Sequence, residues 1–143
     1  MSNKSYRLGV GIMLLNSEKK VFVGKRIDSK KKAWQMPQGG INKGETEEEA
    51  AIRELYEETG IKKIEIISKS KKFFKYKIPL SLKKNLWNNK YVGQKQKWFV
   101  MQFNGIENKD INLNVSKSEF SDWKWIRIQD LEKSIVPFKK KNV

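Results

Sequence analysis

Three glutamates near the middle of the chain are spaced so that they can bind one metal ion. Residues 53–58 read Arg-Glu-Leu-Tyr-Glu-Glu, which puts Glu54, Glu57 and Glu58 at positions i, i+3 and i+4. On a helix these positions lie on one face. Neighbouring carboxylates repel one another unless a cation neutralises them, and hard divalent cations prefer oxygen ligands. The spacing predicts a Mg²⁺ site on a helix, with Mn²⁺ or another divalent cation as a possible substitute.

The alternative is an acidic helix that only faces solvent, as charged runs usually do. Glu47, Glu48 and Glu49 fit that alternative, because negative charge suits the N-terminus of a helix. The later glutamates do not, since a solvated helix needs neither flanking glycines nor an arginine at a fixed offset. We expect Arg53 to clamp one carboxylate while the others bind metal.

The flanking residues predict where this helix begins and ends. Thr46 followed by Glu49 is typical of a capping box, and Gly60 suits a left-handed C-cap. Residues 37–40, Pro-Gln-Gly-Gly, are expected to interrupt strand structure and to bring the backbone close to a ligand. A small apolar face that packs the helix down, with the glutamates outward, is expected from Ala50, Ala51, Ile52 and Leu55.

Length and composition exclude several kinds of chemistry. A chain of 143 residues predicts a single domain over 1–143 with a buried core. It contains no cysteine and no histidine, which excludes disulfides, a thiolate nucleophile and a histidine base. No apolar run approaches the ~20 residues of a membrane span, and the polar start is not a signal peptide. We expect a cytoplasmic protein that does not bind membranes.

The net charge of +15 predicts a polyanionic partner. The chain carries 31 Lys and Arg against 16 Asp and Glu, and strongly basic domains most often bind nucleic acid. A composition bias toward Lys, Asn and Ile is the alternative source of the charge. In that case the few arginines are the more informative cations: Arg7, Arg26, Arg53 and Arg127.

Hydrophobic periodicity predicts strands on both sides of the acidic helix. Residues 96–103 suit burial on both faces, which favours a central strand. The element order predicts an α+β fold in which a mixed sheet is sandwiched between helices. Strands are expected over 9–15, 21–26, 33–36, 64–67, 73–78, 96–103 and 123–128, with a turn over 16–20, a basic loop or short helix over 79–90, and a helix over 129–135.

Residues 39–61 resemble the Nudix box, G-x5-E-x7-R-E-U-x-E-E-x-G-U with U aliphatic, at every defined position. The resemblance extends over about residues 6–140 and is greatest to one branch of the Nudix hydrolases. That branch is the bacterial RNA pyrophosphohydrolases, formerly described as dinucleoside polyphosphate hydrolases or invasion-associated proteins. The most specific segments are Gly-Gln-Lys-Gln-Lys-Trp-Phe at 93–99 and Glu-Phe-Ser-Asp-Trp-Lys-Trp at 119–125.

This resemblance implies a Nudix fold and the attack of an activated water on phosphorus. The RNA branch removes pyrophosphate from the 5′ end of a transcript and leaves a monophosphate, a step in RNA 5′-end processing and mRNA decay. It implies that Glu54, Glu57 and Glu58 ligate Mg²⁺ with a backbone carbonyl near Gly39. One of the three could instead be the general base, and which one stays open. Glu119 would complete the metal site, or else be an ordinary surface residue.

Substrate contacts are expected from cations and aromatic residues. Arg7 and Arg26 suit phosphates, and Arg26 could also stack on a base opposite Phe138. The resemblance implies that backbone groups near Val136 touch the second nucleotide. Further candidates near the phosphates are Gln38, Tyr76, Gln94, Lys97 and Lys139. The strand aromatics, by contrast, are expected to pack in the core: Trp34, Trp98, Phe99, Phe103, Trp123 and Trp125.

Three functions are consistent with these features. The first is hydrolysis of 5′-triphosphorylated RNA, and the second is hydrolysis of dinucleoside polyphosphates such as diadenosine tetraphosphate. The third is a catalytically silent module that binds nucleotide or RNA, against which the intact carboxylate set argues. Relatives carry a further helix after the Phe-Lys segment, which we expect to be missing or trimmed here. The sequence identifies no protein partner.

Overall fold

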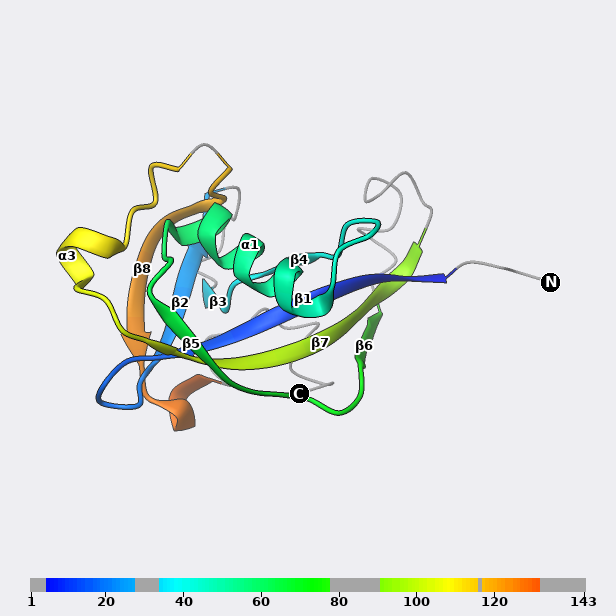
Figure 1. Cartoon of the computed structure of the whole chain (residues 1–143), viewed down its shortest axis with the longest axis horizontal. Helices are drawn as coiled ribbons and strands as arrows, with labels where there is room; N and C mark the ends of the chain where they lie inside the picture. Colours follow the sequence, from blue (N-terminus) through cyan, green and yellow to red (C-terminus); the bar gives the residue numbers. More distant parts are fainter. Residues whose placement is uncertain (1–4, 28–33, 78–90, 116, 132–143) are drawn as a thin grey trace.

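The fold consists of a mixed sheet with one long helix (Figure 1). The computed structural model describes residues 5–27, 34–77, 91–115 and 117–131. In chain order its elements are β1 (Ser5–Leu15), β2 (Val21–Arg26), β3 (Trp34–Gln35), β4 (Gln38–Gly40), α1 (Glu47–Thr59), β5 (Ile64–Lys69), β6 (Phe74–Lys77), β7 (Tyr91–Phe103), α3 (Glu107–Asp110), β8 (Phe120–Ile126) and a 3₁₀ turn at Ile128–Asp130.

Strands β1 and β7 form the centre of the sheet. They run parallel, with paired residues from Ser5 and Tyr91 to Leu15 and Gln102. β1 also pairs antiparallel with β2 and β4, β2 pairs with β3 and β8, and β7 pairs with β5 and β6. Helix α1 packs against β1 and β4 on one side of this sheet. The arrangement confirms the predicted α+β class with a mixed sheet.

Side-chain alternation along the central strands divides the core between the two faces of the sheet. On the face toward α1 the fully buried residues include Val10, Ile12, Leu14, Ala50, Ala51, Leu55, Phe99 and Met101. On the other face the Trp98 ring lies directly over Gly11, where a Cβ would collide with it. The predicted core aromatics are confirmed, with Phe99 and Phe103 buried and the four tryptophans partly buried.

The local signals at the helix ends and at the first turn are confirmed. Thr46 Oγ1 accepts from Glu49 N at 3.0 Å, and Glu49 Oε1 accepts from Thr46 N at 2.9 Å. Gly60 closes α1 with φ of +74°. In the turn after β1, Asn16 Oδ1 accepts the backbone N–H groups of Glu18 and Lys20, as expected for an Asx turn.

Several element predictions were wrong in their detail. Residues 38–40 form β4, because glycines here let two backbones approach: a Cβ on Gly9 would come within 2.6 Å of Gly39 O. β7 begins at Tyr91, five residues before the expected start. β8 begins at Phe120, which pairs with Arg26, and ends before the 3₁₀ turn that contains Ile128. The short helix α3 was not predicted.

Burial also departs from prediction at two places. Ile52 was expected in the apolar face of α1, but it is 44% exposed because it points away from the sheet. In β7, Phe99, Met101 and Phe103 are buried, whereas Trp98, Val100 and Gln102 are only partly buried. Over residues 98–103, burial is therefore complete on the α1 face alone, whereas Gln96 is fully buried on the opposite face.

Some predictions concern residues outside the described part of the chain. They are the loop or helix over 79–90, residues 132–135 of the helix predicted over 129–135, and the substrate contacts of Val136, Phe138 and Lys139. Within the four described ranges, no helix is long and apolar enough to cross a membrane.

Candidate active site on helix α1

Arg53 is the hub of the acidic cluster on α1. Its Nε donates to Glu45 Oε2 at 2.6 Å and its Nη2 donates to Glu45 Oε1 at 2.9 Å. Nη1 donates to Glu54 at 2.7 Å and to Glu57 at 3.1 Å, while Nη2 also donates to the carbonyl of Gly40 at 2.7 Å. The expectation that Arg53 clamps one carboxylate was too narrow, because its planar fork of five donors holds three carboxylates and β4.

Glu54 is wedged against the backbone of β4. A Cβ on Gly39 would collide with the carboxylate of Glu54, so only glycine leaves room for this acid. The side chain of Glu54 is 13% exposed. This burial raises the pKa of Glu54, although the hydrogen bond and charge of Arg53 oppose the rise. Gly39 thus has the close-approach role that its place in the box predicts.

Glu58 is the most buried acid of the helix, at 7% exposure. The prediction that it points outward was therefore wrong. Its carboxylate accepts from the backbone N–H of Glu119 at 3.2 Å, and its backbone carbonyl accepts from Ser118 Oγ at 2.8 Å. Burial raises the pKa of Glu58 to about 7, and the negative charges of Glu119 and Glu54 add to the rise. The segment at 118–119 therefore meets α1 although it lies some 60 residues away in sequence.

The donor set of this cluster suits a hard divalent cation. The acidic groups offer only carboxylate oxygens, together with backbone carbonyls of β4. The charge of Glu57 raises the pKa of Glu54, and the charge of Glu54 raises the pKa of Glu58, so these acids lie close together. Among the described residues no three acidic side chains are already grouped as a metal site. The geometry gives the reason: Glu54 and Glu57 are turned to Arg53, and Glu119 is turned to Arg26.

A comparison with known protein families bears on this arrangement. The family described as the NUDIX domain matches residues 5–143, nearly the whole chain. The chain belongs to the Nudix family. Nudix hydrolases generally use divalent metal ions, which agrees with the oxygen-only donor set on the Nudix helix α1.

Curated relatives share about half of their residues with this Nudix chain. The RNA pyrophosphohydrolase of Rickettsia typhi (strain ATCC VR-144 / Wilmington) is 52% identical over 136 residues, covering 95% of this chain and 84% of that protein. The RNA pyrophosphohydrolase of Rickettsia rickettsii (strain Sheila Smith) is 50% identical over 148 residues, covering 99% and 91% respectively.

Solved structures share the Nudix fold at low sequence identity. The E. coli dihydroneopterin triphosphate pyrophosphohydrolase aligns with a TM-score of 0.72 at 19% identity, covering 96% of this chain and 94% of that one. A C. elegans Ap4A hydrolase binary complex aligns with a TM-score of 0.63 at 19% identity, covering 93% and 90%. At such identity the likeness shows the fold.

Two arginines expected to contact substrate lie at the edges of the Nudix helix. Arg26 Nη1 pairs with Glu119 Oε2 at 3.0 Å, and their side chains are 30% and 58% exposed. Arg7 lies against Gly40, where a Cβ would collide with its guanidinium, and its charge lowers the pKa of Glu54 slightly against the effect of burial. Both cations therefore lie beside the acidic cluster.

Three glutamines form a polar group on the face of the sheet opposite α1. Gln96 Nε2 donates to Gln38 Oε1 at 2.9 Å and to Gln94 Oε1 at 3.0 Å. Gln96 is fully buried, and its Oε1 has no hydrogen-bond partner in the described structure. Gln38 and Gln94 were predicted site residues, whereas Gln96 was missed. The Gln-x-Gln pattern in a strand, which puts both amides on one face, could have indicated it.

Two other candidates differ from these glutamines. Tyr76 pairs with Gln94 across β6 and β7 and shares its face, but it is 1% exposed, and its hydroxyl accepts from Trp98 Nε1 at 2.8 Å, which argues against a substrate contact. Lys97 projects to the face of β7 opposite Gln94 and Gln96, since odd and even positions alternate. Its Nζ donates to the carbonyl of Lys71 at 3.0 Å. Glu45, a box position given no role beforehand, instead proves to be the main partner of Arg53.

Proposed function

We propose that this chain is an RNA 5′-pyrophosphohydrolase. It would remove pyrophosphate from the 5′-triphosphate end of RNA and leave a 5′-monophosphate. The observation that carries the proposal is the identity of 50–52% to proteins named RNA pyrophosphohydrolase, over 84–91% of their length. The complete box glutamates, brought together on one helix, support a catalytic protein over a silent binding module.

Mg²⁺ is the proposed cofactor, with Glu54, Glu57, Glu58 and Glu119 and the Gly39 carbonyl as the residues that would hold it. The bound cation would supply neutralisation of the polyphosphate charge and a lower pKa for the attacking water. Arg53 would fix the rotamers of Glu54 and Glu57. The raised pKa of Glu58 is that of the metal-free protein, and a bound cation would lower it, so that Glu58 would bind the metal as a carboxylate.

The substrate would be held by residues around this cluster. Arg7 and Arg26 lie beside it and would contact phosphates, while Gln38 and Gln94 offer amide groups on the adjoining sheet face. Phe138, Val136 and Lys139 remain predictions for the nucleotide-binding wall.

Product analysis tests the proposal. A 5′-triphosphorylated RNA oligomer and diadenosine tetraphosphate are incubated with the protein and Mg²⁺ at matched concentration, with Glu57→Gln protein as control. We expect faster turnover of the RNA to a 5′-monophosphate end, and none with the variant. Preferred turnover of the dinucleotide would support the alternative function, hydrolysis of dinucleoside polyphosphates. A C. elegans Ap4A hydrolase shares the fold. Reaction of neither substrate would support a binding module.

A further inference from the structure

A group of lysine and aromatic side chains lies on the sheet beyond the N-terminal end of helix α1. Register puts its strand residues on one face: Tyr6 pairs with Gly93, Leu8 with Lys95, and Lys75 with Lys95. Phe73, just before β6, joins them through its ring contacts with Lys95 and Lys97. Residues paired across strands share a face, as do positions two apart in a strand. We call this group the lysine–aromatic surface: Tyr6, Leu8, Phe73, Lys75, Lys95 and Lys97.

This face is the one that α1 covers further along the sheet. Val10 of β1 and Phe99 of β7 continue the same alternation and are fully buried in the core beneath α1. The lysine–aromatic surface lies before that cover begins, next to β6, which Figure 1 shows at one end of the sheet. Leu8 is 47% exposed and Lys75 is exposed, so an apolar and a charged side chain both face solvent here.

The lysines of this surface lie over aromatic rings. Lys75 Nζ is 5.3 Å from the centre of the Tyr6 ring, and the Phe73 ring has Lys95 Nζ at 5.4 Å and Lys97 Nζ at 4.9 Å. Such contacts hold the ammonium groups and the rings in one layer. A base that stacks on a ring would then have a lysine beside it for the adjoining phosphate.

The positive charge of this surface is not compensated by ion pairs. Lys75, Lys95 and Lys97 form no ion pair with a carboxylate of the described residues, although Lys97 lies near enough to Glu48 to lower its pKa together with the dominant Lys69 contact. Lys75 and Lys95 are also direct cross-strand partners. Like charges in that position destabilise a sheet, so the arrangement costs folding free energy and suits a polyanion that neutralises it.

We propose that the lysine–aromatic surface binds single-stranded RNA, with Phe73 and Tyr6 as stacking platforms and Lys75, Lys95 and Lys97 as phosphate contacts. Alternating rings and cations are the combination that recognises unpaired strands without sequence preference. Rigid duplexes offer no bases for stacking, and a protein partner would have to be strongly acidic.

This surface differs in position from the proposed catalytic site. It lies beyond the N-terminal end of α1, where Lys97 is near Glu48, whereas Glu54, Glu57 and Glu58 lie in the second half of that helix. Gln94, a proposed substrate contact, projects to the sheet face opposite its neighbour Lys95. Among the described strands β6 pairs only with β7, so it forms an edge of the sheet here. An RNA strand held near Gln94 would have to pass around β6 to reach Lys95 on the other face. Binding at the surface is independent of hydrolysis, and its test does not depend on the proposed activity.

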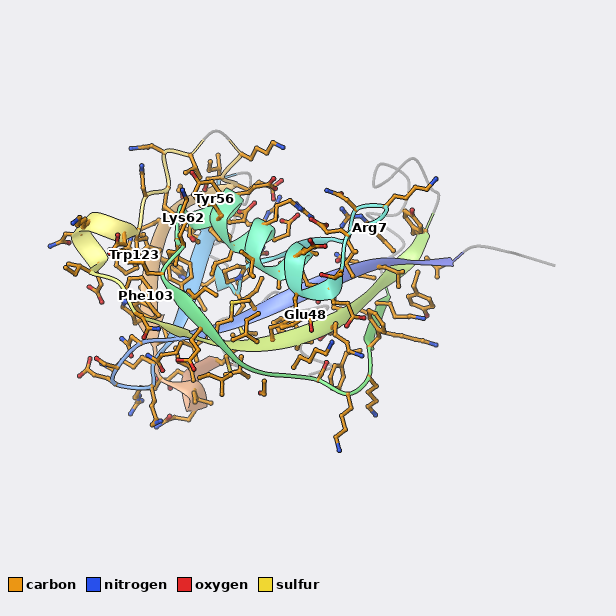
Figure 2. The ribbon with its side chains drawn as sticks, in the orientation of Figure 1. Arg7, Glu48, Tyr56, Lys62, Phe103 and Trp123 are labelled. Atoms are coloured by element: carbon orange, nitrogen blue, oxygen red, sulfur yellow. The ribbon has the colours of Figure 1, made fainter. Side chains whose placement is uncertain are left out.

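Fluorescence anisotropy with a labelled 20-nucleotide single-stranded RNA bearing a 5′-hydroxyl tests the inference. The test variant is Lys75→Glu/Lys95→Glu, which reverses the charge but keeps the like-charge pair across the strands. The matched control is Lys62→Glu/Lys109→Glu, with the same change in net charge at exposed positions away from β6 (Figures 1 and 2). A third variant, Phe73→Leu, removes a ring and no charge.

We expect the Kd of the test variant to rise at least about 10-fold at low salt, with little change in the control. The slope of log Kd against log salt should fall by about 1.4, because each phosphate contact with a single strand contributes about 0.7. Phe73→Leu should weaken binding about 5-fold.

Two results would overturn the inference. Equal weakening in the test and control variants would assign RNA binding to general charge attraction. Unchanged RNA affinity in the test variant would show that RNA is not the partner of this surface. This conclusion would also hold if the variant kept its RNA affinity but lost binding to phosphatidylglycerol vesicles. Circular dichroism and thermal melting of each variant establish that it is folded.

Discussion

Helix α1 carries two groups of glutamates whose surroundings differ. In the first turn, Glu47 and Glu48 pair with Lys69 at 3.2 and 2.8 Å near the surface, where the helix N-terminus also favours negative charge. In the second half, Glu54 and Glu57 share one arginine, and Glu58 is buried beside Glu119. Each group has fewer nearby cations than carboxylates, but the second is more buried: Glu58 is 7% exposed, whereas the side chain of Glu48 is 46% exposed. The buried group is the one that needs a further cation, because water does not screen its charges.

The largest expected difference between the two groups is in catalysis. Glu54→Gln should lower kcat by at least about 10²-fold, because even outer partners of metal ligands cost 10–100-fold when replaced. Glu48→Gln should change kcat less than 2-fold, since its partner is an exposed lysine. Steady-state hydrolysis of a 5′-triphosphorylated RNA, with the released pyrophosphate quantified, measures both. Similar losses in the two variants would show that the two groups do not differ in function.

Arg53→Ala should have the next largest effect, on stability. It leaves three partly buried carboxylates without their shared cation, and we expect the free energy of unfolding to fall by about 3 kcal/mol. Urea denaturation of the metal-free protein measures this. Arg127→Ala is the control, because Arg127 pairs with Asp130 at the surface and its loss should change the free energy of unfolding much less. Equal losses would show that the Arg53 hub contributes no more than a surface ion pair.

The buried acid of the second group should make stability depend on pH. The pKa of Glu58 is about 7 in the folded protein and near its ordinary value of 4.5 when unfolded. Between these values the folded state binds more protons, so the stability of the metal-free protein should fall as pH rises from 4.5 to 7. Glu58→Gln should remove this component. Thermal melting in EDTA across that range measures it.

Glu65→Gln, at an exposed position of β5, serves as the control for this pH series. If the wild type and Glu58→Gln lose stability in parallel over the range, the buried acid is not the source of the pH dependence.

The smallest expected effect concerns the first turn alone. Thr46→Ala removes the side-chain acceptor for Glu49 N and should lower the free energy of unfolding by about 1 kcal/mol, without changing the Mg²⁺ dependence of hydrolysis. Thr46→Ser keeps the oxygen and should remain close to the wild type. Chemical denaturation gives the first quantity, and a Mg²⁺ titration of activity gives the second. A large shift in Mg²⁺ dependence would mean that the two ends of α1 are coupled.

Much of this arrangement could be predicted from sequence because the signals are local. The capping box at Thr46 and Glu49 and the C-cap at Gly60 depend on residues within one helix, and all were confirmed. The Nudix-box pattern likewise predicted which glutamates share the helix. The family was confirmed by the NUDIX domain match, whereas the single domain and the metal and substrate roles of the residues remain predictions.

What could not be predicted depends on contacts between distant segments. The burial of Glu58 follows from the approach of Ser118 and Glu119, and the triple pairing of Arg53 follows from the position of Glu45. β4 forms because glycines in two separate strands allow close backbone approach, which a search for strand-forming side chains misses. The burial of Tyr76 depends on the pairing of β6 with β7, which the sequence alone does not indicate.

The close fit of Glu54 against Gly39 restricts how this protein can change during evolution. Any side chain at position 39 would meet the carboxylate of Glu54, so that substitution would be tolerated only if residue 54 became shorter first. A shorter acid at 54 would in turn leave a gap beside an unchanged glycine. Neither single step preserves the fit, and the two positions are therefore expected to be inherited as a pair.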